Sequence, residues 1–316
     1  PPASARCSRG RPDVDTGLDV VTGALSYTGL SIAEQLLARG RRVRTLTSHV
    51  DRPHPARIDV RPYRFDDRAA LTSSFEGATT LYNTFWVRFA RGRTTFDDAV
   101  TGSRALFEAA ADAGVERIVH ISITKPSLDS PLPYFHGKAL VEQALRETGL
   151  AHTIVRPTVV FGRGDVLLNN IAWLLRRLPI FAIPGTGKYR VRPVHVDDVA
   201  RLCVETRGGT VDAVGPEVFT FEEMVGLVRH AVGSRALLVH VPPVVVPLLT
   251  GLLGLLVGDV VLTADELRGL MDELVTTDGP ATGSIALTDW LQEEGGQLGR
   301  GYASELRRHF RAPAPA

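Results

Sequence analysis

The chain has 316 residues, of which 44% are hydrophobic and 22% are charged, and its formal net charge is +1. This length and apolar content suit one large α/β unit or two subdomains, and the near-zero charge argues against a nucleic-acid-binding surface. Cys7 and Cys203 are too few for a disulfide framework, and residues 1–17 lack the apolar segment of a signal peptide. We therefore expect a cytoplasmic protein with a disordered lead-in over residues 1–17 and an unstructured tail over residues 311–316.

Short apolar runs alternate with longer helical patterns from residue 18 onward. The apolar runs predict strands at 18–22, 43–47, 58–65, 80–84, 117–123 and 152–156. Helical spacing, followed each time by a glycine, predicts helices at 30–39, 97–113 and 134–147. Strands that alternate with helices in this way form right-handed βαβ crossovers. The sequence therefore predicts an α/β fold with a Rossmann-type, doubly wound parallel sheet.

The alternation breaks after residue 157. A helix is predicted at 166–177, the prolines and glycines of 179–187 indicate a loop, and 193–199 return to a strand followed by a helix. We assign residues 18–160 and 190–215 to the Rossmann domain. Residues 161–189 and 216–310 then form a smaller C-terminal substrate lobe over the carboxyl edge of the sheet, where ligands bind in such folds.

Residues 241–258 form an uncharged stretch of eighteen residues. That length is at the lower limit for a membrane-spanning helix. However, Pro242, Pro243 and Pro247 interrupt its first third. We therefore expect a buried or amphipathic core helix here rather than membrane contact.

A glycine turn follows the first predicted strand and reads GALSYTG over residues 23–29. Gly23 permits a tight turn, Gly29 permits close contact between helix and strand, and the N–H groups of the helix start would face a pyrophosphate. Ser26 stands where a glycine is usual, so the motif alone is also compatible with a purely structural turn. Its position in the first βα turn favours a dinucleotide site that includes Gly23, Ser26, Tyr27, Thr28 and Gly29.

The end of the second predicted strand bears on the choice of dinucleotide. An NAD-selective site usually has Asp or Glu there to hold the ribose 2′-hydroxyl, and none is present. Thr47, Ser48 and His49 can instead hydrogen-bond a 2′-phosphate, with Arg44 or Arg52 nearby. We therefore favour NADP(H) over NAD(H).

Two further segments lie where the ligand crevice is expected. Asp66 and Asp67 follow the third predicted strand, where they either accept a hydrogen bond from the adenine amino group or begin a helix. Residues 84–93 combine aromatic side chains with arginines, among them Trp86 and Arg88. This segment either binds an anionic or aromatic substrate or is an ordinary solvated loop.

Tyr134 and Lys138 are four residues apart in a predicted helix, so both side chains lie on one face, one turn apart. An ammonium beside a phenol stabilises the phenolate, and we expect Lys138 to lower the Tyr134 pKa from about 10. Tyr134 can then exchange a proton with a carbonyl or alcohol oxygen as hydride moves. Ser122 or Thr124, at the end of the fifth predicted strand, would hydrogen-bond that oxygen, and the sequence does not choose between them.

These residues resemble the extended and atypical branches of the short-chain dehydrogenase/reductase superfamily, from about residue 18 to about residue 310. The resemblance rests on the 23–29 turn, VERIVHIS at 115–122, Tyr134 with Lys138, VRPTVVFG at 155–162 and HVDDVA at 195–200. The turn and NTFW at 83–86 are more similar to NmrA-like proteins and to the accessory dinucleotide-binding subunit of respiratory complex I. Some of those relatives have no known turnover. The chain departs from them by retaining Tyr134 and Lys138.

The resemblance implies further contacts. It assigns to the cofactor site Asn83, Thr84, Phe85, Pro157, Thr158 and Val159, and to the substrate site Asn169, Asn170 and Trp173. It also makes His195, Asp197 and Asp198 a structural motif that joins the two domains, so we expect no metal.

The sequence as a whole predicts an NAD(P)(H)-dependent oxidoreductase acting on a carbonyl or alcohol of a small molecule. Ser122 or Thr124 positions the substrate oxygen, Tyr134 is the acid or base, and Lys138 holds the nicotinamide ribose and tunes Tyr134. Two alternatives stay open. One is a sugar-nucleotide-type epimerase or dehydratase that recycles its cofactor, and the other is an NADP(H)-binding sensor or structural protein without turnover. We expect no nucleic acid and no membrane as partners, and a homodimer is compatible with the sequence.

Overall fold

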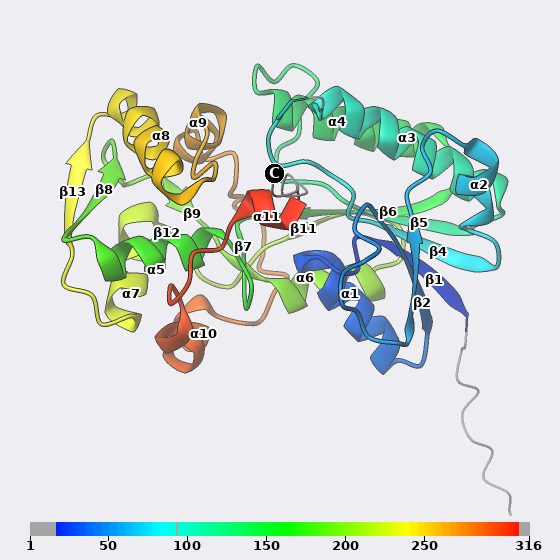
Figure 1. The fold of residues 1–316 in the computed structure, drawn as a ribbon, viewed down its shortest axis with the longest axis horizontal. Helices are drawn as coiled ribbons and strands as arrows, with labels where there is room; N and C mark the ends of the chain where they lie inside the picture. Colours follow the sequence, from blue (N-terminus) through cyan, green and yellow to red (C-terminus); the bar gives the residue numbers. More distant parts are fainter. Residues whose placement is uncertain (1–16, 93, 310–316) are drawn as a thin grey trace, which may run out of the picture.

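The computed structural model describes residues 17–92 and 94–309. Its centre is a seven-stranded sheet in the order β11-β6-β5-β4-β1-β2-β3, in which every pair of neighbours is parallel. The predicted doubly wound α/β fold is therefore confirmed (Figure 1). The strands are β1 (Leu18–Thr22), β2 (Arg42–Thr47), β3 (Ile58–Pro62), β4 (Ala78–Asn83), β5 (Arg117–Ile121), β6 (Ala151–Pro157) and β11 (Gly209–Ala213).

Helices cover both faces of this sheet. In Figure 1, α3 and α4 lie above the sheet and α1 and α6 lie below it. Each side has its own buried core, with Leu81, Leu106 and Ile118 on the α3 and α4 side and Ile32 and Val199 on the other. The helices are α1 (Tyr27–Ala38), α2 (Arg68–Ser73), α3 (Phe96–Asp112), α4 (Pro133–Glu147) and α6 (Val196–Glu205).

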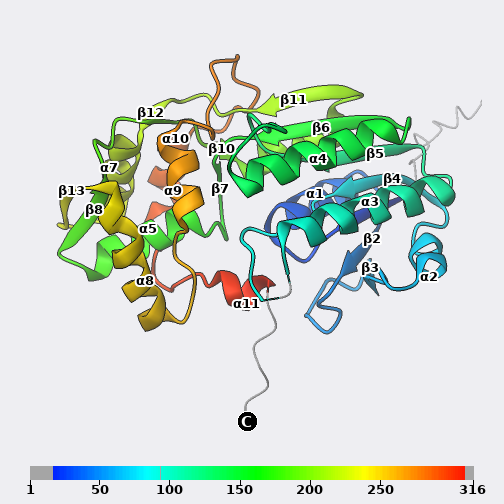
Figure 2. The same ribbon diagram turned by 90° about the horizontal axis from the view of Figure 1, so that it is seen from above.

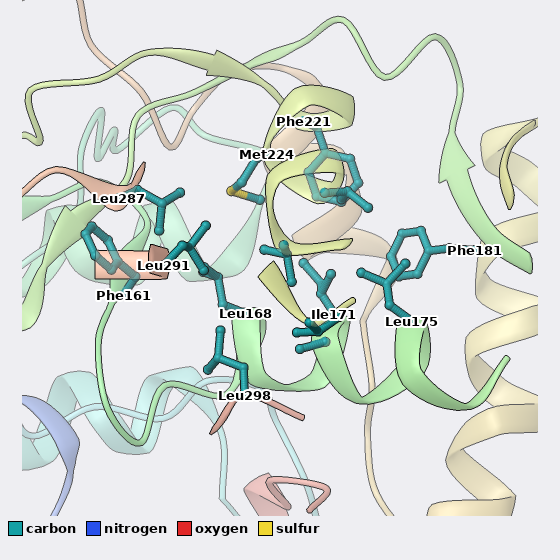
Figure 3. Close-up of a cluster of buried hydrophobic side chains, with 14 of the residues drawn as sticks. Phe161, Leu168, Ile171, Leu175, Phe181, Phe221, Met224, Leu287, Leu291 and Leu298 are labelled. Atoms are coloured by element: carbon teal, nitrogen blue, oxygen red, sulfur yellow. The ribbon is translucent and has the colours of Figure 1, made fainter. Parts of the chain in front are cut away.

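A smaller lobe lies beyond the carboxyl ends of the strands (Figures 1 and 2). Its core packs Phe161, Leu168 and Met224 with leucines of a later helix (Figure 3). Its strands are β8 (Ile180–Pro184), β9 (Arg190–Val191), β12 (Phe219–Thr220) and β13 (Leu237–Val241), and β7 (Val160–Phe161) pairs with β10 (Val194–His195). Its helices are α5 (Leu167–Arg177), α7 (Phe221–Ala231), η1 (Pro243–Val245), α8 (Val246–Val257), α9 (Ala264–Met271), α10 (Leu287–Glu294), η2 (Gly295–Gln297) and α11 (Glu305–His309).

Several elements differ from the sequence prediction. The strand expected at 58–65 ends at Pro62, and the loop expected at 179–187 contains β8, which pairs in parallel with β13. Helix α2 and strand β11 were not predicted, because α2 is short and β11 is a largely exposed edge strand. The lead-in and tail expected at 1–17 and 311–316 lie, apart from Gly17, outside the described residues.

The expectation of a buried or amphipathic core helix at 241–258 is wrong. The segment contains the end of β13, then η1 and α8, and Val246 is the one side chain of α8 that is buried. Val244, Leu255 and Leu256 are each more than 80% exposed. The three prolines shorten the helix as expected, but the helix lies on the outside of the lobe because its neighbours cover only one side of it. No helix among the described residues is both long and apolar enough to cross a membrane.

Candidate cofactor and catalytic cleft

The glycine turn closes tightly between β1 and α1. Gly23 has a φ of +68°, which favours glycine, and its N–H donates to the Leu46 carbonyl at 3.0 Å. A Cβ on Gly29 would lie 2.2 Å from the Gly23 carbonyl oxygen, so only glycine allows this approach of helix to turn. Thr45 Oγ1 accepts from the Ala24 N–H at 2.9 Å and fixes the turn against β2.

The start of α1 is suited to an anion. Ser26 is the N-cap residue, but its hydroxyl donates to the Gly23 carbonyl at 2.6 Å rather than capping the helix N–H groups. The first turn of α1 carries no acidic residue. The N–H groups at the start of α1 and the positive end of the helix dipole can therefore receive a pyrophosphate.

Two connected cavities follow this turn, and we name them the outer and inner cavity. The outer cavity has a volume of about 240 Å³ and is lined by Gly23, Ser26, Thr47, Ser48, His49, Arg52, Tyr63, Phe85 and others. The inner cavity has a volume of about 300 Å³ and is lined by Ser26, Tyr27, Thr28, Ser122, Tyr134, Lys138, Pro157, Thr158 and others. Both are lined by Ser26, Thr84, Trp86, Val87, Arg88 and Glu305, so they form one cleft.

Some residues assigned to the cofactor from the sequence lie elsewhere. Asp67 accepts from the Ala70 N–H and caps α2, and Asp66 is exposed, so neither lines the outer cavity. Asn83 is buried behind the turn, where its side-chain oxygen is 3.2 Å from Thr22 Oγ1. The Val159 carbonyl accepts from the Val194 N–H and holds the start of β10. Arg44 pairs with Asp59 at 2.6 Å and does not line the outer cavity.

Tyr134 and Lys138 lie one turn apart on α4 and both face the inner cavity. Lys138 Nζ donates to the Ile121 carbonyl at 2.8 Å and lies 4.6 Å from the centre of the Trp86 ring. Trp86 in turn meets the Tyr134 ring edge-on at 5.8 Å. Gly137, between the pair, lets the indole lie against α4, because a Cβ there would be 2.9 Å from the Trp86 ring.

The electrostatics of this pair differ from the sequence expectation. Burial lowers the pKa of Lys138 to about 7, although Glu142 acts in the opposite direction. The pKa of Tyr134 is raised, chiefly by burial and further by Glu266, while Arg88 acts against the shift. The expectation that Lys138 lowers the Tyr134 pKa is therefore wrong for this structure. Burial of the phenol and the carboxylates of Glu266 and Glu305 all raise this pKa.

The two candidate hydroxyls have different surroundings. Ser122 lines the inner cavity, and its Oγ donates to Glu142 Oε1 at 2.6 Å. Thr124 does not line that cavity, and its Oγ1 donates to the Leu274 carbonyl at 2.9 Å.

Glu142 was not singled out from the sequence. It is buried, and Arg156 binds both of its oxygens, at 2.8 and 2.6 Å. Burial pushes the pKa of Glu142 up, but hydrogen bonds from Arg156 and Ser122 outweigh it and hold the pKa below its usual value.

Arg88 lines both cavities of the cleft, and it is already paired. Its guanidinium binds Glu266 of α9 and the Val261 carbonyl, and it lies 3.7 Å from Glu305. An anionic substrate would have to compete with two carboxylates. The inner cavity is therefore better suited to a neutral group.

The other substrate candidates lie outside this cleft. Asn169 and Asn170 donate to the carbonyls of Gly301 and Ala303, and Trp173 packs against Tyr302 at 5.3 Å. These side chains hold residues 299–303 against the lobe. That segment leads to Glu305, which lines both cavities. Sequence reasoning missed Glu305, because it is far from Arg88 along the chain.

The motif at 195–200 has a structural setting. His195 caps α6 by accepting from the Asp197 N–H, and Asp198 accepts from the N–H groups of Ser284 and Ile285 at 2.9 Å each. Within residues 17–92 and 94–309, no group of three or more His, Cys, Asp or Glu side chains could hold a metal ion.

Comparisons with known proteins agree with this geometry. Residues 23–168 match a family model described as NAD(P)H-binding. The chain is 24% identical over 250 residues to NADH dehydrogenase [ubiquinone] 1 alpha subcomplex subunit 9, mitochondrial, of Arabidopsis thaliana, covering 74% of this chain and 62% of that protein. It is 27% identical over 239 residues to the ceramide reductase of Caulobacter vibrioides, covering 72% of this chain and 74% of that one. The chain thus spans about three fifths of the Arabidopsis relative.

The fold is shared with a solved reductase. The triphenylmethane reductase of Citrobacter sp., complexed with NADP(H), superposes with a TM-score of 0.66 at 18% identity, covering 88% of this chain and 99% of that one. At this identity the likeness concerns the fold alone. Residues 23–168 thus match an NAD(P)H-binding domain, and the cleft and these relatives are consistent with the extended, NmrA-like branch of the short-chain dehydrogenase/reductase superfamily.

Proposed function

We propose that this protein is an NAD(P)(H)-dependent oxidoreductase that acts on a carbonyl or alcohol group of a neutral small molecule. The observation that carries the proposal is that Tyr134, Lys138 and Ser122 line one cavity, which continues into the cavity of the glycine turn. A nucleotide bound along the turn would bring its reactive end toward Tyr134.

A dinucleotide bound in the cleft would supply or accept the hydride. Tyr134, whose pKa is raised, holds its proton at neutral pH and donates it to the carbonyl oxygen as that oxygen becomes an alcohol. Ser122 is the hydroxyl available to hydrogen-bond the same oxygen, and Glu142 fixes its orientation. Lys138 would hold the ribose hydroxyls. A protonated phenol favours the reductive direction, because reduction is the direction that consumes its proton.

We further propose that NADPH binds at least as tightly as NADH. Thr47, Ser48, His49 and Arg52 line the outer cavity, and no carboxylate stands at the end of β2 to favour a free 2′-hydroxyl. Titration of the purified protein with each nucleotide, followed by nicotinamide fluorescence, tests this. A clear preference for NADH would overturn the preference, and no binding of either would overturn the cofactor site itself.

Tyr134→Phe tests the catalytic role. It should reduce turnover by about 10²–10⁴-fold and leave NADPH binding nearly unchanged, because only a proton donor is removed. Tyr189→Phe is a matched control, since it removes a buried hydroxyl that has no hydrogen-bond partner in the lobe. Substrates would come from a panel of ketones, aldehydes, quinones and nucleotide sugars, with a long-chain lipid ketone added because one relative is named ceramide reductase. Wild-type turnover by Tyr134→Phe would contradict the assignment.

A second candidate is a dinucleotide-binding protein without turnover. The raised Tyr134 pKa favours it, because general acids and bases work best with a pKa near the working pH. The lowered Lys138 pKa reduces the positive charge available to stabilise a phenolate. On this alternative NADPH binds, no member of the panel is reduced, and Tyr134→Phe changes nothing.

A further inference from the structure

Helix α8 presents an apolar ridge to the outside of the lobe. Val244, Leu248, Leu252, Leu255 and Leu256 are 83, 64, 55, 82 and 85% exposed. Their spacing of three and four residues puts most of them on one side of the helix. Exposed leucines scattered singly are ordinary, but a row of four along α8, continued by Val244 of the preceding η1 turn, is not.

The side of α8 that faces the protein is narrow. Val246 is buried, Thr250, Leu253 and Val257 are half-buried, and the remaining leucines of the helix are exposed. At about 100° per residue, the exposed positions cover more than half of the circumference. α8 is therefore a protruding ridge and not one wall of a groove.

The segment has little that could specify a polar partner. Residues 241–258 carry no charged side chain, and the Thr250 hydroxyl donates to the Val246 carbonyl of its own helix. The chain segments outside the described residues are also poor candidates to cover it. Residues 1–16 contain one large aliphatic or aromatic side chain, Val14, and residues 310–316 contain one, Phe310.

A second copy of the chain would also cover the ridge poorly. A helix of 12 residues is about 18 Å long and about 10 Å wide, so helix-to-helix contact buries only a few hundred Å². A stable interface needs about 800 Å² from each partner. Two ridges in contact would also leave the flanks of each helix in water.

We propose that α8 lies in the interfacial region of a lipid bilayer, with its exposed leucines among the acyl chains. A bilayer can cover a protruding apolar helix on all of its exposed sides, whereas the flat surface of a protein partner covers only one side. The helix is too short to span, so it would lie along the membrane. This reverses the sequence expectation of no membrane contact, and it does not depend on the oxidoreductase activity proposed above.

The position of α8 relates this surface to the cleft. Asp259, directly after α8, accepts from the N–H groups of Glu305 and Leu306, and Glu305 lines both cavities. α9 follows and packs on α4, where a Cβ on Gly269 would lie 3.0 Å from the Phe135 ring. In Figure 2, α8 and α11 both lie toward the lower edge of the molecule. A bilayer under α8 would therefore lie beside the elements that border the inner cavity.

Flotation with phosphatidylcholine vesicles tests the proposal. Wild-type protein should float with these uncharged vesicles, and binding should persist at high salt because no charge of 241–258 contributes. Leu255→Ser/Leu256→Ser should weaken the partitioning about 100-fold, since each leucine contributes about tenfold. Leu128→Ser/Val218→Ser removes two exposed apolar side chains elsewhere and should bind like wild type.

Further measurements separate the alternatives. NADPH binding by both double variants reports that they are folded, and Leu256→Trp fluorescence should be quenched by lipids brominated on their acyl chains. Absence of flotation by folded wild-type protein would overturn the proposal. Binding only to anionic vesicles at low salt would also overturn it, because arginines would then carry the contact. A dimer that Leu255→Ser/Leu256→Ser dissociates, without vesicle binding, would assign the ridge to a second copy instead.

Discussion

Gly29→Ala is the sharpest test of the turn between β1 and α1. The new methyl group would lie 2.2 Å from the Gly23 carbonyl oxygen, 2.7 Å from the Gly23 carbonyl carbon and 3.1 Å from the Ala24 nitrogen. All three are backbone atoms, so no side-chain rotation relieves the overlap, and the turn or the helix must move by about 1 Å. Overpacking of this kind costs about 3 kcal/mol, and the better helix propensity of alanine returns about 1 kcal/mol. We expect a net loss of about 2 kcal/mol in the free energy of unfolding.

The same displacement should weaken NADPH binding at least tenfold, because the N–H groups at the start of α1 would no longer face the pyrophosphate. Urea unfolding and NADPH fluorescence titration measure the two effects. Gly226→Ala in α7 is the matched control: a Cβ there meets no atom within 4 Å, so stability should be unchanged or rise by up to about 1 kcal/mol. If Gly29→Ala has wild-type stability and wild-type NADPH affinity, the contact between Gly29 and the Gly23 carbonyl is not needed to form the cofactor site, and this reasoning is refuted.

Three further predictions concern buried polar groups near the cleft. Lys138→Met should stabilise the protein by about 2–4 kcal/mol below pH 7. The gain should shrink toward zero by about pH 10, because folding lowers the Lys138 pKa to about 7. Between about pH 7 and pH 10 the unfolded wild-type chain binds one more proton than the folded protein, so wild-type stability rises with pH. Unfolding curves across this pH range measure the difference. Glu142→Gln should lower the free energy of unfolding by about 2–3 kcal/mol at neutral pH, because it weakens the bonds to Arg146 and Arg156. The difference from wild type should disappear in acid, as the pH falls through the lowered pKa of Glu142. Equal stability at neutral pH would contradict this, and reduced turnover would report that Ser122 is no longer held. Thr45→Val should cost about 1–3 kcal/mol and weaken NADPH binding, since the Ala24 N–H loses its buried acceptor; calorimetry and the same titration check both effects.

The strands and the turn could be predicted because their signals are local. β1 has the predicted bounds, and all five of its residues are buried, with Leu18, Val20 and Val21 supplying the apolar signal. The Tyr134 and Lys138 pair lies on one helix, so its spacing alone predicted a common face. What the sequence could not supply depends on the packing of distant segments. Glu142 is recognisable as a partner of Ser122 only once α4 and β5 are adjacent, and the Tyr134 pKa depends on Glu266 of α9.

The surface helix illustrates the same limit. Hydrophobicity indicated that 241–258 contains a helix, which is α8, but it could not predict which neighbours would cover that helix. β11 shows the reverse case. Its sequence, GTVDA, is too polar to suggest a strand, and it becomes one because β6 offers an open edge next to it.

The place of β11 has a consequence for how the chain can fold and be divided. About 50 residues separate β6 from β11, and they build much of the lobe before the chain returns to pair Gly209 through Ala213 with Thr153 through Pro157. Until then β6 is an unprotected strand edge, available to pair with another chain during synthesis. A fragment cut at the limits of the family match, residues 23–168, would lose both β1 and β11 and keep that edge permanently open. The cofactor-binding domain is thus not a separable module, and its sheet is complete only when the polypeptide has passed through the lobe and come back.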